Sequence, residues 1–209
     1  MPRIAKAREG AEPTSEGQRE RQERILAAAA RLGSEHELAR VQMAEVAKDA
    51  GVAIGTLYRY FPSKTHLFVA LLLNQLVRAS DRLPRREPGT SPTQAICDAL
   101  VVMTRRIVAR PRLAAAMLVS NSTASAAAVP DSVEVDRHFH RMLFAQGGID
   151  RPTDRDRDAV RLLSMVWFGL ILVFLNGRAS LEETEADILR ACDLLLAHMN
   201  EAPPAARRR

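Results

Sequence analysis

The stretch from residue 42 to residue 68 constrains the fold of this chain more than any other part of the sequence. Small or apolar residues recur there at helical spacing, Gly51 falls where a first helix would end, and Leu57 continues the apolar face beyond it. This pattern predicts two short helices joined by a tight turn, the second at about residues 53–60. In a helix-turn-helix of this kind, the second helix is free to enter the major groove of DNA.

The second predicted helix is unusual for the side chains that it leaves outside. Val52, Leu57 and Phe61 can pack inward, which leaves the residues between them as an outward surface. Thr and Tyr hydroxyls bond phosphate oxygens, and the planar guanidinium of Arg suits guanine or phosphate. The alternative is a short surface helix whose aromatic rings half-cover a core. The predicted outward residues are Gly55, Thr56, Tyr58, Arg59 and Tyr60.

The segment that follows favours the DNA-binding interpretation. Pro62 stops the helix, Ser63 is a good N-cap, and an apolar stripe predicts a connecting helix over residues 63–82. Lys64 falls in the first turn of this helix, where the helix dipole disfavours a cation by about 0.3–1 kcal/mol. A DNA phosphate just outside that end would explain the cation, and a solvated lysine is the alternative. The stripe consists of Leu67, Phe68, Leu71, Leu72 and Leu76.

Many spaced positions in about the first 80 residues together resemble the signature of the TetR family of bacterial transcriptional regulators. The resemblance implies an all-α fold, with an N-terminal three-helix helix-turn-helix DNA-binding head and a C-terminal helical ligand-binding and dimerisation domain. Gln42 and Ala53 depart from the family pattern, in which Thr or Ser often caps the two helices of the motif. Both positions stay among the predicted DNA-binding residues, and Gln42 is long enough to make a contact of its own. The matching positions are Val46-Ala47, Ala50-Gly51-Val52, Gly55-Thr56-Leu57-Tyr58, Tyr60-Phe61 and Ser63-Lys64.

Composition and the positions of helix-breaking residues predict the domain organisation. An apolar fraction of 47% and a charged fraction of 26% are ordinary for a soluble globular protein, and a net charge of +5 permits nucleic-acid binding without demanding it. A break rich in proline and glycine follows the connecting helix and marks a domain boundary. The predicted segments are a flexible N-terminal arm (1–16), the helix-turn-helix domain (17–62), the connecting helix (63–82), the ligand-binding and dimerisation domain (83–200) and a basic tail (201–209).

Two helices near the end of the chain have more apolar surface than one small domain can bury. Residues 154–176 carry apolar side chains all round the helix, and residues 182–199 carry a broad apolar face. We therefore expect a homodimer in which each copy contributes these two helices to a four-helix bundle, as the family resemblance also implies. A well-buried intramolecular core is the alternative. No membrane association is expected, because the apolar run at 162–175 is shorter than the roughly 20 residues of a membrane span.

Apolar residues between residue 92 and residue 175 are candidates for lining a cavity that holds a small apolar effector, although core packing is the usual role of such residues. Residues 52–64, together with Trp167 and residues 178–180, resemble the mycobacterial repressors of cholesterol catabolism. That resemblance implies a steroid or an acyl-CoA thioester as the effector, with Arg105, Arg106 or Arg110 as candidates for its phosphates. The predicted lining residues are Met103, Ile107, Met117, Phe139, Met142, Trp167, Phe168 and Ile171.

The sequence carries no pattern that predicts a cofactor, a metal site or catalytic residues. Three aspartates at 154, 156 and 158 alternate as in a calcium loop, but Ala159 and Met165 stand where that loop needs Gly and Glu. Thr153 as an N-cap, with acids in the first turn of a helix, explains these aspartates better. Phosphate-loop, dinucleotide, serine-hydrolase and zinc-protease motifs are not found in the sequence.

Two cysteines, Cys97 and Cys192, fall in apolar helical contexts. We expect buried free thiols in a reducing cytoplasm, with a redox sensor as the alternative.

The function predicted from the sequence is that of a homodimeric, ligand-responsive, cytoplasmic repressor that binds a palindromic operator. Two alternatives remain open at this point. One is an activator of the same fold, and the other is a helical small-molecule-binding protein or enzyme that does not act on DNA.

Overall fold

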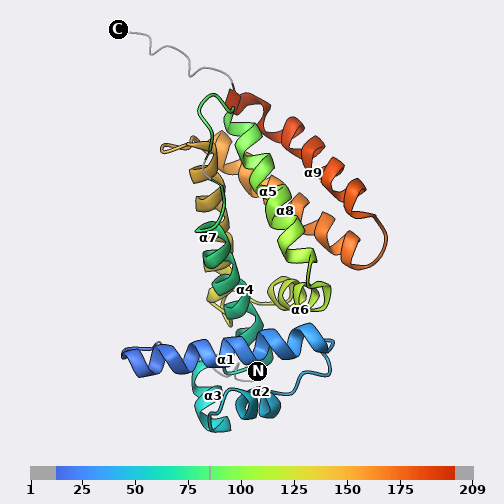
Figure 1. Cartoon of the computed structure of the whole chain (residues 1–209). Coiled ribbons are helices and arrows are strands. Elements are labelled where there is room, and N and C mark those ends of the chain that lie inside the picture. Colours follow the sequence, from blue (N-terminus) through green and yellow to red (C-terminus); the bar gives the residue numbers. More distant parts are fainter. Residues whose placement is uncertain (1–12, 85, 201–209) are drawn as a thin grey trace, which may run out of the picture. The chain divides into compact units, whose positions relative to one another are not determined.

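The computed structural model describes residues 13–84 and 86–200, and every regular element within these ranges is a helix (Figure 1). This confirms the expected all-α fold. The described chain divides into two compact units. Unit 1 comprises residues 13–78 and 109–138, and unit 2 comprises the described part of 79–108 together with residues 139–200. The predicted arm and tail fall largely outside the described residues.

Unit 1 contains the helix-turn-helix, but it extends beyond the segment predicted for the head. It also holds α6 and the first part of α7, which follow the boundary that the sequence placed near residue 83. α1 packs against both α2 and α6. Its helices are α1 (Glu16–Glu35), α2 (Met43–Asp49), α3 (Ile54–Tyr60), α4 (Lys64–Ser80), α6 (Pro111–Ser122) and α7 (Asp131–Gly147), of which α4 and α7 continue into unit 2.

The turn between α2 and α3 is the Schellman motif that a glycine permits. Gly51 has a φ of +64°, a conformation that costs an L side chain energy, and its N–H donates to the Lys48 carbonyl at 3.1 Å. The N–H of Val52 donates to the Ala47 carbonyl at 3.0 Å, which completes the motif. The turn therefore closes α2 and sets the direction in which α3 starts.

The core of unit 1 is built from the predicted stripes. Leu57 of α3 and the apolar face of α4 are buried, as expected from their spacing. Ile25, Leu26 and Ala29 of α1 are also buried. Ser63 caps α4, because its Oγ accepts from the His66 N–H at 3.3 Å, as expected.

Unit 2 is a second helical core formed by α5 (Pro92–Val108), α8 (Asp154–Leu175), α9 (Leu181–Leu196), the short 3-10 helix η1 (Ala197–Asn200) and the end of α7. α9 packs against α8 and α5. The connection between α6 and α7 is short, because α6 continues to Ser122 and α7 begins at Asp131. Fully buried side chains in this unit include Ile96, Leu100, Leu163, Ile171, Ile188 and Leu196.

The two cysteines meet in the core of unit 2. Both thiols are free and buried, as expected, and Cys97 lies on α5 while Cys192 lies on α9. A hydrogen bond with Cys97, together with burial, raises the pKa of the Cys192 thiol. A thiol that resists ionisation is a poor nucleophile, so the structure favours a packing role for this pair over redox sensing.

Among the described helices, α8 is long and apolar enough to cross a membrane by length and composition, and only 28% of its apolar window is buried within the chain. Its charged residues end at Arg161, which leaves residues 162–175 as the uncharged part. That run is shorter than the roughly 20 residues of a membrane span.

α8 and α9 both begin with a capping box. At the start of α8, the Thr153 Oγ1 accepts from the Asp156 N–H at 3.2 Å, and the Asp156 carboxylate accepts from the Thr153 N–H at 2.7 Å. Burial opposes ionisation of Asp156, but its hydrogen bonds with Thr153 and with His198 outweigh this, so its pKa lies below the ordinary value of 3.8. Ser180 and Glu183 form the equivalent box on α9.

The Thr153→Ala variant tests the first box. Loss of the hydroxyl should lower the free energy of unfolding by about 1 kcal/mol at neutral pH. Because the folded pKa of Asp156 lies below its unfolded value, the carboxylate stabilises the fold above about pH 4, and this contribution is lost as the pH falls through the folded pKa. The deficit of the variant should therefore shrink in acid. Urea unfolding at one fixed protein concentration, followed by circular dichroism from pH 7 to pH 3, measures both effects.

The matched control is Thr153→Ser, which keeps the hydroxyl and should unfold like the natural protein. A deficit of equal size at every pH would show that the Thr153 hydroxyl acts only by accepting from the Asp156 N–H and not by donating to the ionised carboxylate.

Candidate nucleic-acid interface

α3 is an exposed helix of seven residues, anchored by its buried side. Leu57 is fully buried and Phe61, its C-cap residue, is 3% exposed, whereas the Tyr58 side chain is 47% exposed. Arg59 also lies on the exposed side. The structure therefore presents one aromatic hydroxyl and one guanidinium side by side in the chain, on a helix that its neighbours hold in place.

Most of the predicted DNA-binding residues lie at the surface. Gln42, Ala53 and Gly55 are exposed and Thr56 is half-buried. Gln42 and Ala53 occupy the N-cap positions of α2 and α3, and neither side chain makes a capping hydrogen bond. A Cβ added at Gly55 would meet no atom within 4 Å, so this position opens onto solvent.

Tyr60 does not lie outward, and the expectation that it does is wrong. Its side chain is 5% exposed, and its hydroxyl oxygen is buried without a hydrogen-bond partner within the described chain. Tyr60 follows Leu57 by three residues, which places both on the buried face of the helix. The Arg59 guanidinium carbon lies 5.5 Å from the centre of the Tyr60 ring, so Tyr60 supports Arg59 from below.

Ile54 is an exposed residue that the sequence reasoning missed. Its side chain is 43% exposed on the first turn of α3, one helical turn before Tyr58. The i, i+4 spacing to Tyr58 was the available signal. An exposed apolar side chain at this place is suited to contact a thymine methyl group.

Lys64 has a protein environment that the sequence did not reveal. Its Nζ donates to the carbonyl of Leu38 at 2.8 Å and to that of Ala39 at 3.4 Å, in the connection between α1 and α2. These carbonyls offset the unfavourable helix dipole, so the cation is explained without an external anion. An ammonium group has three N–H donors, and the two carbonyls use two of them.

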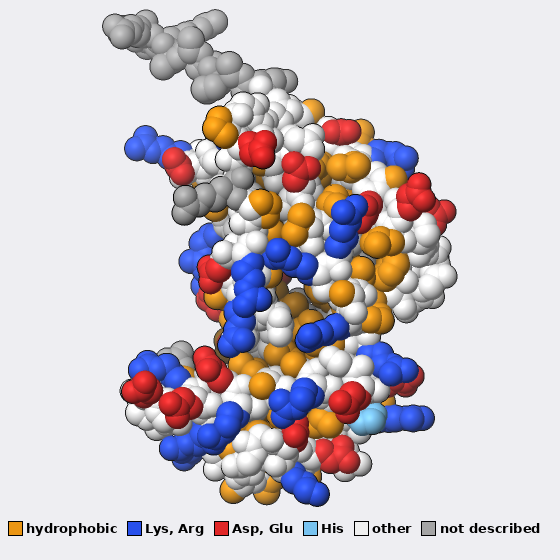
Figure 2. Space-filling model, viewed as in Figure 1, with side chains coloured by type: hydrophobic (Ala, Val, Ile, Leu, Met, Phe, Trp, Pro, Cys, Tyr) orange, Lys and Arg blue, Asp and Glu red, His pale blue; other side chains and the backbone are white. Residues whose placement is uncertain are grey.

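Charge is mixed over the surface of unit 1. Figure 2 shows Lys and Arg side chains interleaved with Asp and Glu side chains on the face in view. Arg31, for example, pairs with Asp49 at 2.6 Å. Any DNA-binding role therefore depends on where the basic groups lie and not on an excess of positive charge.

The predicted ligand-binding residues are only partly brought together. Phe139 and Trp167 stack in unit 2 with ring centres 4.9 Å apart, whereas Met117 belongs to unit 1. The Trp167 Nε1–H donates to the Thr104 Oγ1 at 2.9 Å, and that hydroxyl donates to the Leu100 carbonyl at 2.8 Å. Met103, Met142 and Ile171 are buried in unit 2, while Ile107 and Phe168 are half-buried.

Two of the arginines considered for effector phosphates have partners within the protein. Arg105 makes two hydrogen bonds with the Glu185 carboxylate, at 2.6 and 2.7 Å, which lower the pKa of Glu185. Arg106 donates to the Arg82 carbonyl at 3.2 Å. Both side chains are exposed, but each already has a partner within the chain.

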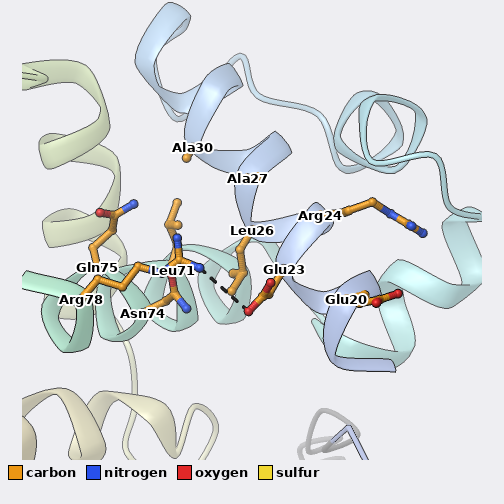
Figure 3. A pocket seen from close by; sticks show the side chains of 10 residues that line it. All are labelled: Glu20, Glu23, Arg24, Leu26, Ala27, Ala30, Leu71, Asn74, Gln75 and Arg78. Atoms are coloured by element: carbon orange, nitrogen blue, oxygen red, sulfur yellow. Dashed lines mark ion pairs between the residues drawn. The ribbon is translucent and has the colours of Figure 1, made fainter. Parts of the chain in front are cut away.

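A groove of about 500 Å³ lies between α1 and α4 within unit 1 (Figure 3). Leu26, Ala27 and Leu71 line its apolar part, and Glu23 faces Arg78 across it at 3.9 Å. None of the predicted ligand-binding residues lines this groove.

An apolar stripe lies exposed on α8. Leu162, Met165 and Val166 are 43%, 60% and 40% exposed, and Gly169 continues their spacing. A Cβ added at Gly169 would meet no atom within 4 Å, so another helix can approach closely there. We call these four residues the α8 stripe. They match the surplus apolar surface expected from the sequence.

Comparison with known proteins identifies relatives over both units of the chain. Residues 25–71 match the tetR family of bacterial regulatory proteins, and residues 89–195 match the tetracyclin repressor-like C-terminal domain. The transcriptional repressor KstR of Rhodococcus jostii is 35% identical over 191 residues, which cover 91% of this chain and 89% of that protein. KstR of Mycobacterium tuberculosis is 33% identical over 90% of this chain and 86% of its own length.

The chain belongs to the TetR family. The family resemblance is thereby confirmed, and a mycobacterial repressor is among the relatives, as expected. The crystal structure of a TetR regulator from Rhodococcus sp. RHA1 is 53% identical, covers 89% of this chain and 100% of its own, and has a TM-score of 0.84. The Thermus thermophilus TetR-family repressor FadR, in complex with lauroyl-CoA, shares the fold at 20% identity over 90% of this chain and 100% of its own, with a TM-score of 0.59.

Proposed function

We propose that this TetR-family protein is a homodimeric transcriptional repressor that binds a palindromic operator and is released from it by an acyl-CoA thioester. The observation that carries the proposal is the exposed Tyr58–Arg59 pair, presented on a short helix whose other side is buried. The 35% identity with KstR, a transcriptional repressor, over about nine-tenths of the chain supports repression over activation. It also supports a cytoplasmic protein that acts on DNA.

The proposed contacts divide by chemistry. Hydroxyls of Tyr58 and Thr56 and the remaining N–H of Lys64 bond phosphates, which fixes the position of α3 in the groove. Arg59 reads a base, with its guanidinium carbon 5.5 Å from the centre of the Tyr60 ring. Gln42, at the start of α2, is the second candidate for a base contact. Gly55, which has no side chain, and Ala53, which has only a methyl group, allow a close approach to the duplex.

The Arg59→Ala variant tests base reading. Binding to the palindromic fragment that copurifies from sheared genomic DNA should weaken by about 1–3 kcal/mol, roughly 5- to 150-fold. Binding to a scrambled fragment should change much less, because non-specific affinity rests on phosphate contacts. Fluorescence anisotropy titrations over a series of salt concentrations separate the two terms.

A control variant and a second test variant accompany this measurement. Arg141→Ala removes an exposed arginine of α7 and should leave operator binding unchanged. Gly55→Ala has space for its methyl group within the protein and should fold normally, but it should bind the operator less tightly. Equal loss on specific and scrambled DNA in Arg59→Ala would mean that Arg59 holds a phosphate and not a base.

A second copy of the chain is the proposed partner of the α8 stripe. Burying apolar surface stabilises by about 25 cal/mol per Å², and a stripe that is exposed in one copy is self-complementary about a two-fold axis. Two heads related by such an axis match a palindromic operator.

Met165→Lys should therefore convert the dimer into a monomer, because it places a cation at the most exposed apolar position of the stripe. Sedimentation equilibrium should give twice the chain mass of 23.1 kDa for the natural protein and the single chain mass for the variant. Val133→Lys makes the same change at an exposed position of α7 outside the stripe and should stay dimeric. A dimeric Met165→Lys protein would place the interface elsewhere.

The proposed effector is an acyl-CoA with an apolar acyl chain. Its support is the apolar and aromatic character of the residues around Trp167, the resemblance carried by residues 52–64, and the lauroyl-CoA held by a repressor of the same fold. A ligand that binds more tightly to a form of the dimer whose DNA-binding heads do not fit the operator shifts the population toward that form and so off DNA.

Lauroyl-CoA should weaken operator binding by roughly 5- to 150-fold, the usual range of allosteric coupling, and should change the fluorescence of Trp167, the chain's single tryptophan. Free CoA and cholesterol are the controls. Release by cholesterol and not by the thioester would replace the proposed ligand class by a steroid. A lack of response to both would remove the sensor half of the proposal while leaving DNA binding untouched.

The alternatives are less well supported. An activator would differ only in the position of its operator, and the KstR relatives are repressors. A helical binding protein or enzyme that does not act on DNA would leave the exposed Tyr58 and Arg59 without a role.

A further inference from the structure

The His66 ring in the first turn of α4 joins two distant parts of unit 1. Its Nε2 lies 2.8 Å from the carbonyl oxygen of Ala128, and its Nδ1 lies 2.8 Å from the Oγ of Ser63. A carbonyl only accepts, so in the neutral ring Nε2 carries the hydrogen and Nδ1 accepts from the Ser63 hydroxyl. That same hydroxyl caps α4 by accepting from the His66 N–H. The side chain is thus held at both ring nitrogens.

Ala128 belongs to the connection at 123–130, which links α6 to α7. Two predicted ligand-binding residues flank this connection in the sequence, since Met117 lies on α6 and Phe139 on α7. A ligand that moves either helix therefore acts on one end of the connection that His66 holds.

The first turn of α4 follows the recognition helix directly. α3 ends at Tyr60, only Phe61, Pro62 and Ser63 separate it from α4, and Phe61 is buried. Proline limits the backbone freedom of this short link. A displacement of the first turn of α4 is therefore passed on to α3 and not absorbed between them.

α4 is tightly packed near its start. A Cβ at Gly33 of α1 would lie 2.9 Å from the Phe68 ring of α4 and 3.1 Å from Leu113 of α6, so a larger residue there would have to displace a side chain of α4 or α6. Arg112 adds a hydrogen bond to the Glu35 carbonyl at the end of α1, at 3.1 Å. The segment 109–138 is thus anchored to the head by packing as well as by His66.

A groove lies between α4 and α1 toward the C-terminal half of α4. The groove of Figure 3 separates the helices there, and the ion pair that crosses it, Arg78 with Glu23, spans 3.9 Å between exposed side chains. Such a pair contributes little rigidity. The first turn of α4, by contrast, is held by the hydrogen bond from His66 to the Ala128 carbonyl.

We propose that His66 is a positioning residue that couples the 123–130 connection to the recognition helix, so that the state of α6 and α7 reaches α3 through the hydrogen bond from His66 to Ala128. The proposal rests on the proposed DNA-binding function and assigns it a route of regulation. His66 contacts no DNA in this scheme. Its role is to make the connection and the recognition helix move as one body.

Hydrogen exchange in the presence and absence of the copurified operator fragment tests this coupling without an effector. Amide hydrogens of the connection and of the start of α7 are bonded locally, so a change in their exchange on DNA binding must be transmitted. Operator DNA should slow their exchange about fivefold in the natural protein, the factor expected from one net hydrogen bond. The reporting amides are those of Ala128, Val129, Ser132 and Val133.

Two isosteric variants separate the coupling from mere packing. His66→Gln places an amide N–H near the position of Nε2 and should keep the slowing. His66→Asn reaches only the position of Nδ1 and should lose it, while still binding the operator. Ser63→Ala frees the ring by removing the hydroxyl that orients it, and it provides a second variant should His66→Asn fold poorly. The slowing should be lost in Ser63→Ala as well.

The outcomes are distinct from those of the proposed function. Operator binding without slowing in the natural protein, or equal slowing in the natural protein, His66→Asn and Ser63→Ala, overturns the coupling and leaves the repressor intact. Absence of operator binding in the natural protein overturns the repressor itself.

Discussion

The recognition helix depends on burial that it cannot supply alone. A helix of seven residues is far below the length at which helices persist in water, so α3 exists because Leu57 and Phe61 are buried against the rest of unit 1. The same burial fixes which side chains remain outside. Exposure of Tyr58 and Arg59 is therefore a consequence of how the opposite face packs.

The Tyr60 side chain shows that neighbouring residues of α3 can differ completely in exposure. It lies three residues after Leu57 on the same face of the helix and is buried in the core, together with its hydroxyl. Its ring then supports the guanidinium of Arg59, so a residue expected to touch DNA instead orients one that does so in our proposal. The helical spacing that predicted a buried Leu57 also predicts a buried residue three positions later, at Tyr60. The prediction that Tyr60 lies outward relied on the chemistry of its hydroxyl and not on this spacing.

Unit 2 shows a different balance between core and surface. On α8, Leu163 and Ile171 are fully buried, while Met165 on the same helix is exposed. Trp167 combines both demands of a buried aromatic, since its ring stacks on Phe139 and its N–H finds Thr104. α5 and α9 pack against α8, and the exposed α8 stripe is the surface that the proposed dimer would bury.

Local rules in the sequence determined the helices, their caps and the turn of the DNA-binding motif. Gly51, Ser63 and Thr153 act through residues one to four positions away, and apolar spacing marked the buried stripe of α4 correctly. Only the tertiary structure decided that segment 109–138 packs with the head, that Lys64 binds carbonyls of the connection before α2, and that His66 meets Ala128. Residues 26 or 62 positions apart in the chain leave no periodic trace of their contact, because such contacts arise from how helices pack and not from how each one forms.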